Sequence, residues 1–260
     1  TGDYFNNFHT EGKDYAEWNK TLWDSAVEES SLIQNLKWRA GYLKKYLSSF
    51  TVYHFHDTSV SSPMRGDCNI NDNEYLRDNG SNLAAFLYSM MQNDETNFRL
   101  IEGVVSSIAP YFKCFKLRPD VNDKERIRLE WEEKETDMYL NGYSFSDGTL
   151  RFIALATLLL QSKTPEVIVI DEPELGLHPA AINKFAELVK RASNKSQIIL
   201  STQSTNLVNC FDVKDIIVVD RIESQSVFRH LSEEDLATWM DEYDLSISDL
   251  WEKNMIGGQL

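Results

Sequence analysis

Apolar residues recur along the first half of this chain in patterns that predict helices and short strands. Residues 25–48 carry Leu, Ile and Tyr at helical spacing with lysines and arginines between them, which indicates an amphipathic helix. A loop rich in Ser, Asp, Asn and Gly over 57–81 precedes two further expected helices, over 82–91 and 95–108. Short alternating runs between residues 112 and 141 then predict an antiparallel hairpin.

The second half changes to continuous apolar strands that alternate with helices. A long apolar helix over 150–160 precedes a strand at 167–170, and Pro179 opens an amphipathic helix. Two more strands are expected further along, at 198–201 and 216–219. This alternation is typical of an α/β fold, in which a parallel sheet is flanked by helices and covered on both faces.

These patterns divide the chain into three expected regions. A helical region with short strands and an inserted hairpin occupies 1–142, and the α/β lobe occupies 143–230. An acidic helical C-terminus follows over 231–260, where Ser232 and Asp235 have the spacing of a capping box.

Composition narrows the class of protein. A chain of 260 residues can bury a substantial core, as one large domain or two small ones. The net charge of −15 argues against a surface made mainly for nucleic-acid backbone, although a local basic patch could still bind it. No stretch approaches the ~20 apolar residues of a membrane span, and the N-terminus lacks a secretion signal pattern. We therefore expect a cytoplasmic protein without a membrane partner.

Two histidines stand close together in a segment that predicts a strand, Phe50 to Phe55. Strand periodicity places His54 and His56 on one face of it. A pair at this spacing can bind zinc, but no further Cys or His lies nearby in the sequence, so we expect an ordinary polar pair.

Two adjacent carboxylates, Asp171 and Glu172, close the apolar strand at 167–170. At the end of a buried strand they lose hydration and repel each other, which a metal ion, a phosphate or good hydrogen bonds can offset. The arrangement resembles the paired acids of P-loop nucleotidases, in which the first acid holds Mg²⁺, so the resemblance implies a Mg²⁺ site at Asp171. An acidic turn after an ordinary core strand is the alternative.

Polar residues before and after these acids point to an anion at the same place. The tetrapeptide directly ahead of the long helix comprises Ser146, Asp147, Gly148 and Thr149. It could present free backbone N–H groups to a phosphate, or it could be an ordinary N-cap. Gln203 follows the next strand, and neighbouring parallel strands end at the same edge of a sheet. We therefore expect Gln203 to meet the two acids, where its amide can bond a phosphate oxygen or a water.

Four nearby glutamates could instead suggest a nuclease metal site. They are dense in the expected hairpin, which makes a solvated face the favoured interpretation, and they comprise Glu130, Glu132, Glu133 and Glu135.

Three motifs and their order resemble those of the ABC-type ATPases of the SMC/RecF-like branch of AAA proteins. They are S-D-G-T, then V-I-V-I-D-E-P-E-L-G-L-H-P, then S-T-Q-S. Within that branch they are most similar to bacterial ATPases related to the overcoming-lysogenization-defect proteins, strongly over 143–220. The resemblance implies that residues Ser146 to Thr149 are the signature motif and that Asp171 is the Walker B acid. Glu172 would then be the catalytic base.

The resemblance also assigns the residues that follow the acids. Glu174 to His178 would form the D-loop, and Gln203 would be the switch residue, where many ABC proteins have histidine. ATP and Mg²⁺ are the implied cofactors. Two such heads pair head to tail, so that the signature motif of one closes over ATP held by the other.

The implied activity is ATP hydrolysis, in DNA maintenance or anti-phage defence, with a partner effector protein. A catalytically silent scaffold, or a regulator of an effector such as a nuclease, is the alternative. A transporter subunit is disfavoured by Gln203 and by the long insert ahead of the signature motif.

One motif of such ATPases is missing from the sequence. The loop that cradles the β- and γ-phosphates has the motif G-x-x-x-x-G-K-[ST], which does not occur in this sequence. The first residue is Thr1 rather than Met. These features predict the C-terminal part of a longer ATPase, and we expect little hydrolysis from these residues alone.

Overall fold

The computed structural model describes residues 50–136, 138–232, 236 and 245–258. From Thr51 onward the chain forms one compact unit. The helix expected over 25–48, and the capping box that Asp235 would complete, lie outside the described residues.

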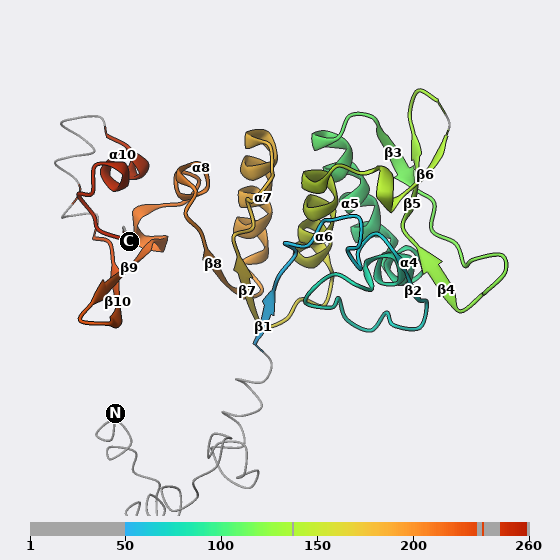
Figure 1. The fold of residues 1–260 in the computed structure, drawn as a ribbon, viewed down its shortest axis with the longest axis horizontal. Helices are drawn as coiled ribbons and strands as arrows, with labels where there is room; N and C mark the ends of the chain where they lie inside the picture. Colours follow the sequence, from blue (N-terminus) through green and yellow to red (C-terminus); the bar gives the residue numbers. More distant parts are fainter. Residues whose placement is uncertain (1–49, 137, 233–235, 237–244, 259–260) are drawn as a thin grey trace, which may run out of the picture. The chain divides into compact units, whose positions relative to one another are not determined.

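A three-stranded parallel sheet forms the centre of the α/β part (Figure 1). Its strand order is β1 (Thr51–Tyr53), β7 (Val167–Asp171) and β8 (Gln197–Ser201), so the first strand comes from the region before the hairpin. Ile168 and Ile170 of β7 are fully buried in the main core, together with aromatic side chains of the flanking helices. The predicted fold class, a parallel sheet flanked by helices, is confirmed.

One row of the sheet is less covered than the sequence predicts. Val52, Val169 and Ile199 are paired across the three strands. Val52 is 41% exposed and Ile199 is 46% exposed, so the described residues do not cover this row. Within the described residues, Val52 and Ile199 thus remain exposed, whereas the sequence pattern predicts a sheet covered on both faces.

Two long helices flank the sheet (Figure 1). Helix α6 (Asp147–Leu160) begins three residues before the apolar run, since Ser146 caps it, and every residue from Thr149 to Leu160 is buried. Helix α7 (Pro179–Ala192) starts at its proline, as expected, and buries Phe185 and most of its other apolar residues on one side. Helix α6 packs against α7 and against α5 (Glu95–Ile108), which follows α4 (Leu83–Asn93).

The predicted hairpin is part of a three-stranded antiparallel sheet, β3-β5-β6. Its strands are β3 (Phe112–Phe115), β5 (Glu130–Glu133) and β6 (Tyr139–Asn141). Trp131 is buried in this sheet and stacks on Phe145 with 4.6 Å between ring centroids. This contact anchors the chain two residues before the start of α6.

Glu132 is not on a solvated face, which corrects the expectation for the glutamates of this region. The residue is 7% exposed, and its carboxylate accepts from Lys113 at 2.5 Å and from Lys116 at 2.6 Å. The neighbouring Glu130 pairs with Arg118 and Arg128. The sequence pattern missed the pairs with Lys113, Lys116 and Arg118 because these cations lie on or just after β3, well before the glutamates in the chain.

A short strand interrupts the expected loop over 57–81. Residues Asp67–Asn69 form β2, which pairs antiparallel with β4 (Arg126–Arg128). Aspartate and asparagine are poor strand formers, which explains why the sequence pattern indicates a loop there.

The strand expected at 216–219 does not join the parallel sheet. It forms β9 (Ile217–Ile222), which pairs antiparallel with β10 (Gln225–His230). Glu223 and Ser224 connect them with φ angles of 48° and 66°, as in a two-residue hairpin turn that follows the twist of the strands. The prediction of a further parallel strand is therefore wrong, because no glycine marks this turn in the sequence.

The remaining described elements are short. Ser246 and Asp249 form a capping box at the start of α10 (Ile247–Glu252). The C-terminal hairpin and this helix share a second, smaller hydrophobic core, made of Val213, Val218, Leu231, Leu236, Ile247, Leu250 and Ile256. The other elements are α8 (Thr205–Val208) and the 3-10 turns η1 (Gly142–Ser144) and η2 (Val213–Asp215).

Candidate functional site at the carboxyl edge of the sheet

The two acids and the end of the next strand meet at one edge of the sheet. Asp171 is paired in register with Ser201, and the backbone N–H of Glu172 donates to the Ser201 carbonyl at 2.9 Å. Gln203 lies two residues beyond this pair, with an exposed side chain. The parallel sheet therefore brings both strand ends together, as the order of the motifs predicts.

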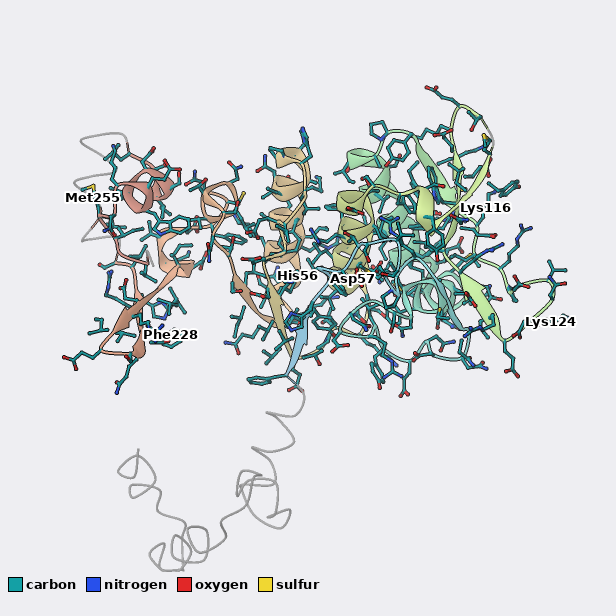
Figure 2. All side chains as sticks on the ribbon, viewed as in Figure 1. His56, Asp57, Lys116, Lys124, Phe228 and Met255 are labelled. Atoms are coloured by element: carbon teal, nitrogen blue, oxygen red, sulfur yellow. The ribbon has the colours of Figure 1, made fainter. Side chains whose placement is uncertain are left out.

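Asp171 is half-buried and is held from two sides. Its carboxylate Oδ1 accepts from the Ser201 hydroxyl, and its backbone carbonyl accepts from Nε2 of His56 at 2.7 Å. Figure 2 shows His56 on the segment that follows β1. A carboxylate oriented in this way, at the open edge of a sheet, fits a hard cation such as Mg²⁺.

Glu172 has a left-handed backbone conformation, with φ of 39°. A non-glycine residue in this region carries a conformational cost of about 1–2 kcal/mol, which the surrounding turn must sustain. Among the described residues, no hydrogen bond fixes its carboxylate. The side chain is thus directed by a strained backbone and remains available to a reactant.

The turn after the acids is tied to the neighbouring strand. Oε1 of Glu174 accepts from the Thr202 hydroxyl at 2.6 Å, and the Glu174 carbonyl accepts from the N–H of Leu177 at 2.9 Å. Oε2 of Glu174 is buried and finds no hydrogen-bond partner among the described residues. This oxygen can accept from a group that these residues do not supply.

The last residue of this turn starts helix α7. His178 is exposed, and its Nδ1 accepts from the N–H of Ala180 at 3.2 Å. In this arrangement His178 is the N-cap of α7, with Pro179 in the first turn.

The tetrapeptide at the start of α6 acts locally as a cap. The Ser146 hydroxyl accepts from the N–H of Thr149 at 3.2 Å, and the hydroxyls of these two residues are 2.8 Å apart. Thr149 is also bonded to the Tyr111 hydroxyl at 3.1 Å and is buried. Ser146 and Asp147 remain exposed. The N-cap is therefore present, and it leaves the outer face of the motif open.

Gly148 joins this motif to the turn after β7. A Cβ atom at Gly148 would lie 2.4 Å from the backbone oxygen of Gly176, which is closer than real Cβ contacts. Gly176 itself has φ of +74°, a conformation that favours glycine. The expected signature motif and D-loop are thus in direct backbone contact within one chain.

Two buried arginines organise the site, and the sequence pattern did not single them out. Arg65 donates to the carbonyls of Gly142 at 2.6 Å and Phe145 at 2.9 Å, and it pairs with Asp147 at 2.7 Å. It thereby holds the segment that leads into α6. An arginine in a Ser- and Asp-rich stretch gives no sequence signal of burial.

Arg151 of α6 connects the helix to the histidine segment. Its Nε donates to the carbonyl of Phe55 at 2.9 Å, and a terminal nitrogen donates to the carbonyl of His56 at 2.8 Å. Burial lowers the pKa of the Arg151 guanidinium, and the carboxylates of Asp147 and Glu174 oppose that effect. An arginine within an otherwise apolar helix was the one clue in the sequence.

Comparison with known proteins gives the family. The family model described as "AAA domain, putative AbiEii toxin, Type IV TA system" matches residues 30–209, so the chain belongs to this family. Partial likeness to an Old nuclease and to ABC-type ATP-binding proteins confirms the resemblance seen in its motifs, which is to ABC/SMC-like AAA ATPases related to the OLD proteins.

Three relatives share part of this sequence. The Old nuclease of Escherichia phage P2 is 31% identical over 111 residues, which are 38% of this chain and 19% of that protein. ABC transporter A family member 11 of Dictyostelium discoideum is 30% identical over 111 residues, or 38% of this chain and 13% of that protein. The energy-coupling factor transporter ATP-binding protein EcfA2 of Staphylococcus aureus is 26% identical over 136 residues, or 49% and 46%. The chain spans less than half the length of each.

Solved structures of SMC ATPase heads also match. An SMC ATPase studied for ATP-driven dimerization has a TM-score of 0.44 and 20% identity, covering 61% of this chain and 98% of that chain. The Smc head of Pyrococcus furiosus bound to the C-terminal domain of ScpA has a TM-score of 0.45 and 20% identity, covering 61% and 40%. Within the described ranges, no helix of this chain is long and apolar enough to cross a membrane.

Proposed function

We propose that this chain carries the hydrolytic edge of an ATPase that uses ATP and Mg²⁺. One observation supports this most: Asp171 and Glu172 stand at the carboxyl end of the central strand, side by side with the end of β8. Ligands bind at this edge in open parallel sheets. Membership of the AAA family supports ATP as the ligand.

The residues of the edge have distinct proposed roles. Asp171 would hold Mg²⁺, which neutralises charge on the transferred phosphoryl group when bound. Glu172, with no hydrogen bond to its carboxylate among the described residues, would accept a proton from the attacking water. The exposed amide of Gln203 would bond a phosphate oxygen or that water.

The start of α6 would serve a second copy of the head. Ser146 and Asp147 are exposed there, with the positive end of the helix dipole behind them. Oε2 of Glu174, which has no hydrogen-bond partner among the described residues, is an acceptor in the adjoining turn, which ends at His178. These features support head-to-tail pairing, in which residues Ser146 to Thr149 close over ATP held by the partner copy.

The biological setting is proposed from the relatives. Likeness to the Old nuclease of phage P2 and to the family model with its toxin description supports a role in anti-phage defence or DNA maintenance in the cytoplasm, with a partner effector protein. Because the match covers 19% of the Old nuclease, the nuclease activity of that protein is not carried over. A silent scaffold or regulator of such an effector is the competing function.

Steady-state ATP hydrolysis by the full-length protein separates these functions. We expect Glu172→Gln to lower the rate by about 10²–10⁴-fold, the typical contribution of a positioned base. Glu166→Gln is the matched control, because Glu166 is exposed and precedes the other end of the same strand. Rates for the wild type and Glu172→Gln that both equal the enzyme-free background would favour the silent scaffold.

A further inference from the structure

Three side chains from two distant parts of the sequence converge beside the acids. His54 and His56 follow β1, and Asp171 ends the neighbouring strand β7. One ligand atom from each of the three lies within 4.8 Å of the others. The sequence shows no further Cys or His near this pair, but the parallel pairing of β1 and β7 brings a carboxylate beside it.

Strand alternation explains why both imidazoles point the same way. Phe55, between them, is 2% exposed and belongs to the main core, so its two neighbours project from the opposite side. The ring centroids of His54 and His56 are 5.9 Å apart, at an interplanar angle of 73°. The two rings thus stand at a separation that lets both face a single ion.

The backbone around the histidines is already held in place. Arg151 donates to the carbonyls of Phe55 and His56, and the N–H of His54 donates to the Asp78 carbonyl at 2.9 Å. Binding an ion would thus require little ordering of the chain, which favours affinity.

The side chains are oriented as well. Nε2 of His56 donates to the Asp171 carbonyl at 2.7 Å, which leaves its Nδ1 with a lone pair. Metal-binding histidines generally make such a bond with the second ring nitrogen. The Ser201 hydroxyl orients the Asp171 carboxylate from the other side.

We propose that His54, His56 and Asp171 bind a divalent transition metal ion, with Zn²⁺ as the representative ion. Two imidazoles and one carboxylate suit Zn²⁺ and related ions, whereas Mg²⁺ prefers oxygen ligands alone. Three protein ligands leave a coordination position open to water or to a phosphate oxygen. His54 is exposed and His56 is half-buried, so an ion can reach the site from solvent.

This inference goes beyond the proposed function, in which Asp171 would hold Mg²⁺ together with ATP: in the nucleotide-free protein, the same carboxylate would bind a transition metal ion with the two histidines. Only a role of the ion in catalysis depends on the proposed function. Binding of the ion needs the three side chains alone and can be measured without nucleotide. Glu172 is outside the ligand set, so Glu172→Gln is expected to keep the metal site although it lowers the rate of ATP hydrolysis.

Calorimetric titration of Zn²⁺ into the nucleotide-free protein tests the site, with Co²⁺ absorption in the visible range as a readout of ligand geometry. We expect one ion per chain, and an affinity that falls about tenfold or more in His54→Ala and in Asp171→Asn. Because His54 is exposed, its replacement should leave the circular dichroism spectrum unchanged. An excess of Mg²⁺ should not displace the ion.

His230→Ala is the matched control, since His230 is an exposed histidine of β10 outside the cluster. It should bind Zn²⁺ as tightly as the wild type. Equal affinity in the wild type and His54→Ala overturns the site, and so does an equal loss in His230→Ala. A Glu172→Gln protein that still hydrolyses ATP but binds Zn²⁺ through His54 overturns the proposed catalytic role of Glu172 and leaves the metal site standing.

Discussion

The backbone of Gly148 rests against the carbonyl oxygen of Gly176, so closely that a methyl group at position 148 would lie 2.4 Å from that oxygen. Gly148 is the second residue of helix α6, and Gly176 lies in the turn that follows the two acids. Since the backbone fixes the position of a Cβ and the oxygen belongs to the backbone, no side-chain rotation can relieve the clash. The contact makes the position of α6 depend on the turn beside the acids.

Gly148→Ala is expected to destabilise the fold by about 1–3 kcal/mol, the usual cost of overpacking, and to lower ATP hydrolysis. Urea unfolding followed by circular dichroism measures the change in free energy. Gly103→Ala is the control, because a Cβ at this position on α5 meets nothing within 4 Å. That substitution should stabilise the helix by up to about 1 kcal/mol, and equal effects at the two glycines would contradict the contact.

At position 172, a glycine variant should be more stable than an alanine variant, the reverse of the usual order within a helix. Both remove the carboxylate, but glycine adopts the φ of 39° without the steric cost of a Cβ. We therefore expect Glu172→Gly to be more stable than Glu172→Ala by about 1 kcal/mol in urea unfolding.

The same pair of substitutions at Glu187 provides the comparison. Glu187 lies within helix α7, where glycine is less favourable than alanine by about 1 kcal/mol. The order of stability should therefore reverse between positions 172 and 187. The same order at both positions would show that Glu172 carries no backbone strain.

Stability should depend on Glu132 below neutral pH. Hydrogen bonds from Lys113 and Lys116 lower the pKa of this carboxyl from 4.5 to about 2. A folded pKa below the unfolded one means that the stabilisation is present above about pH 4.5 and is lost as the pH falls toward 2. Glu132→Gln should remove this part of the acid dependence and be destabilising at pH 7.

The free energy of unfolding, measured from pH 7 to the acid limit of folding, checks this expectation. Glu187→Gln is a suitable control, because Glu187 pairs with Lys184 on the exposed surface of α7. Its pH profile should follow the wild type. Parallel profiles for the wild type and Glu132→Gln would show that the two lysines do not stabilise the carboxylate.

The sequence was enough to predict the part of the site that depends on where neighbouring strands end. An apolar run that ends in Asp171 and a second that ends at Ser201 must deliver both ends to one edge once the strands are parallel. The same logic failed at β9, where a hairpin turn through Glu223 and Ser224 lacks the glycine that normally announces it. Strand periodicity alone does not reveal the strand's partner.

The contacts that complete the site could not be predicted, since they join residues far apart in the chain. The hydrogen bond between His56 and Asp171 spans 115 residues and requires that β1 lie beside β7. Burial of Arg65 and Arg151 depends on carbonyl groups that are brought together only once the loops are folded. The spacing of apolar residues along the chain predicts neither of these contacts.

A design that keeps the cap of α6 tests pairing between two copies. Aspartate is as good an N-cap as serine, so Ser146→Asp should preserve the helix start while its charge repels the phosphates of the partner's ATP. Ser146→Asp alone and Glu172→Gln alone should each hydrolyse ATP at a small fraction of the wild-type rate. Each mixed dimer still contains one site with an intact Glu172 and an intact Ser146.

The most direct measurement is therefore the ATP hydrolysis rate of an equimolar mixture of full-length Ser146→Asp and Glu172→Gln proteins. If Glu172 of one copy acts with the helix start of another, random pairing should restore about a quarter of the wild-type rate, since half of the dimers are mixed and each has one working site. A mixture that stays at the rate of the separate variants, while the wild type hydrolyses ATP, would contradict a catalytic centre shared between two copies.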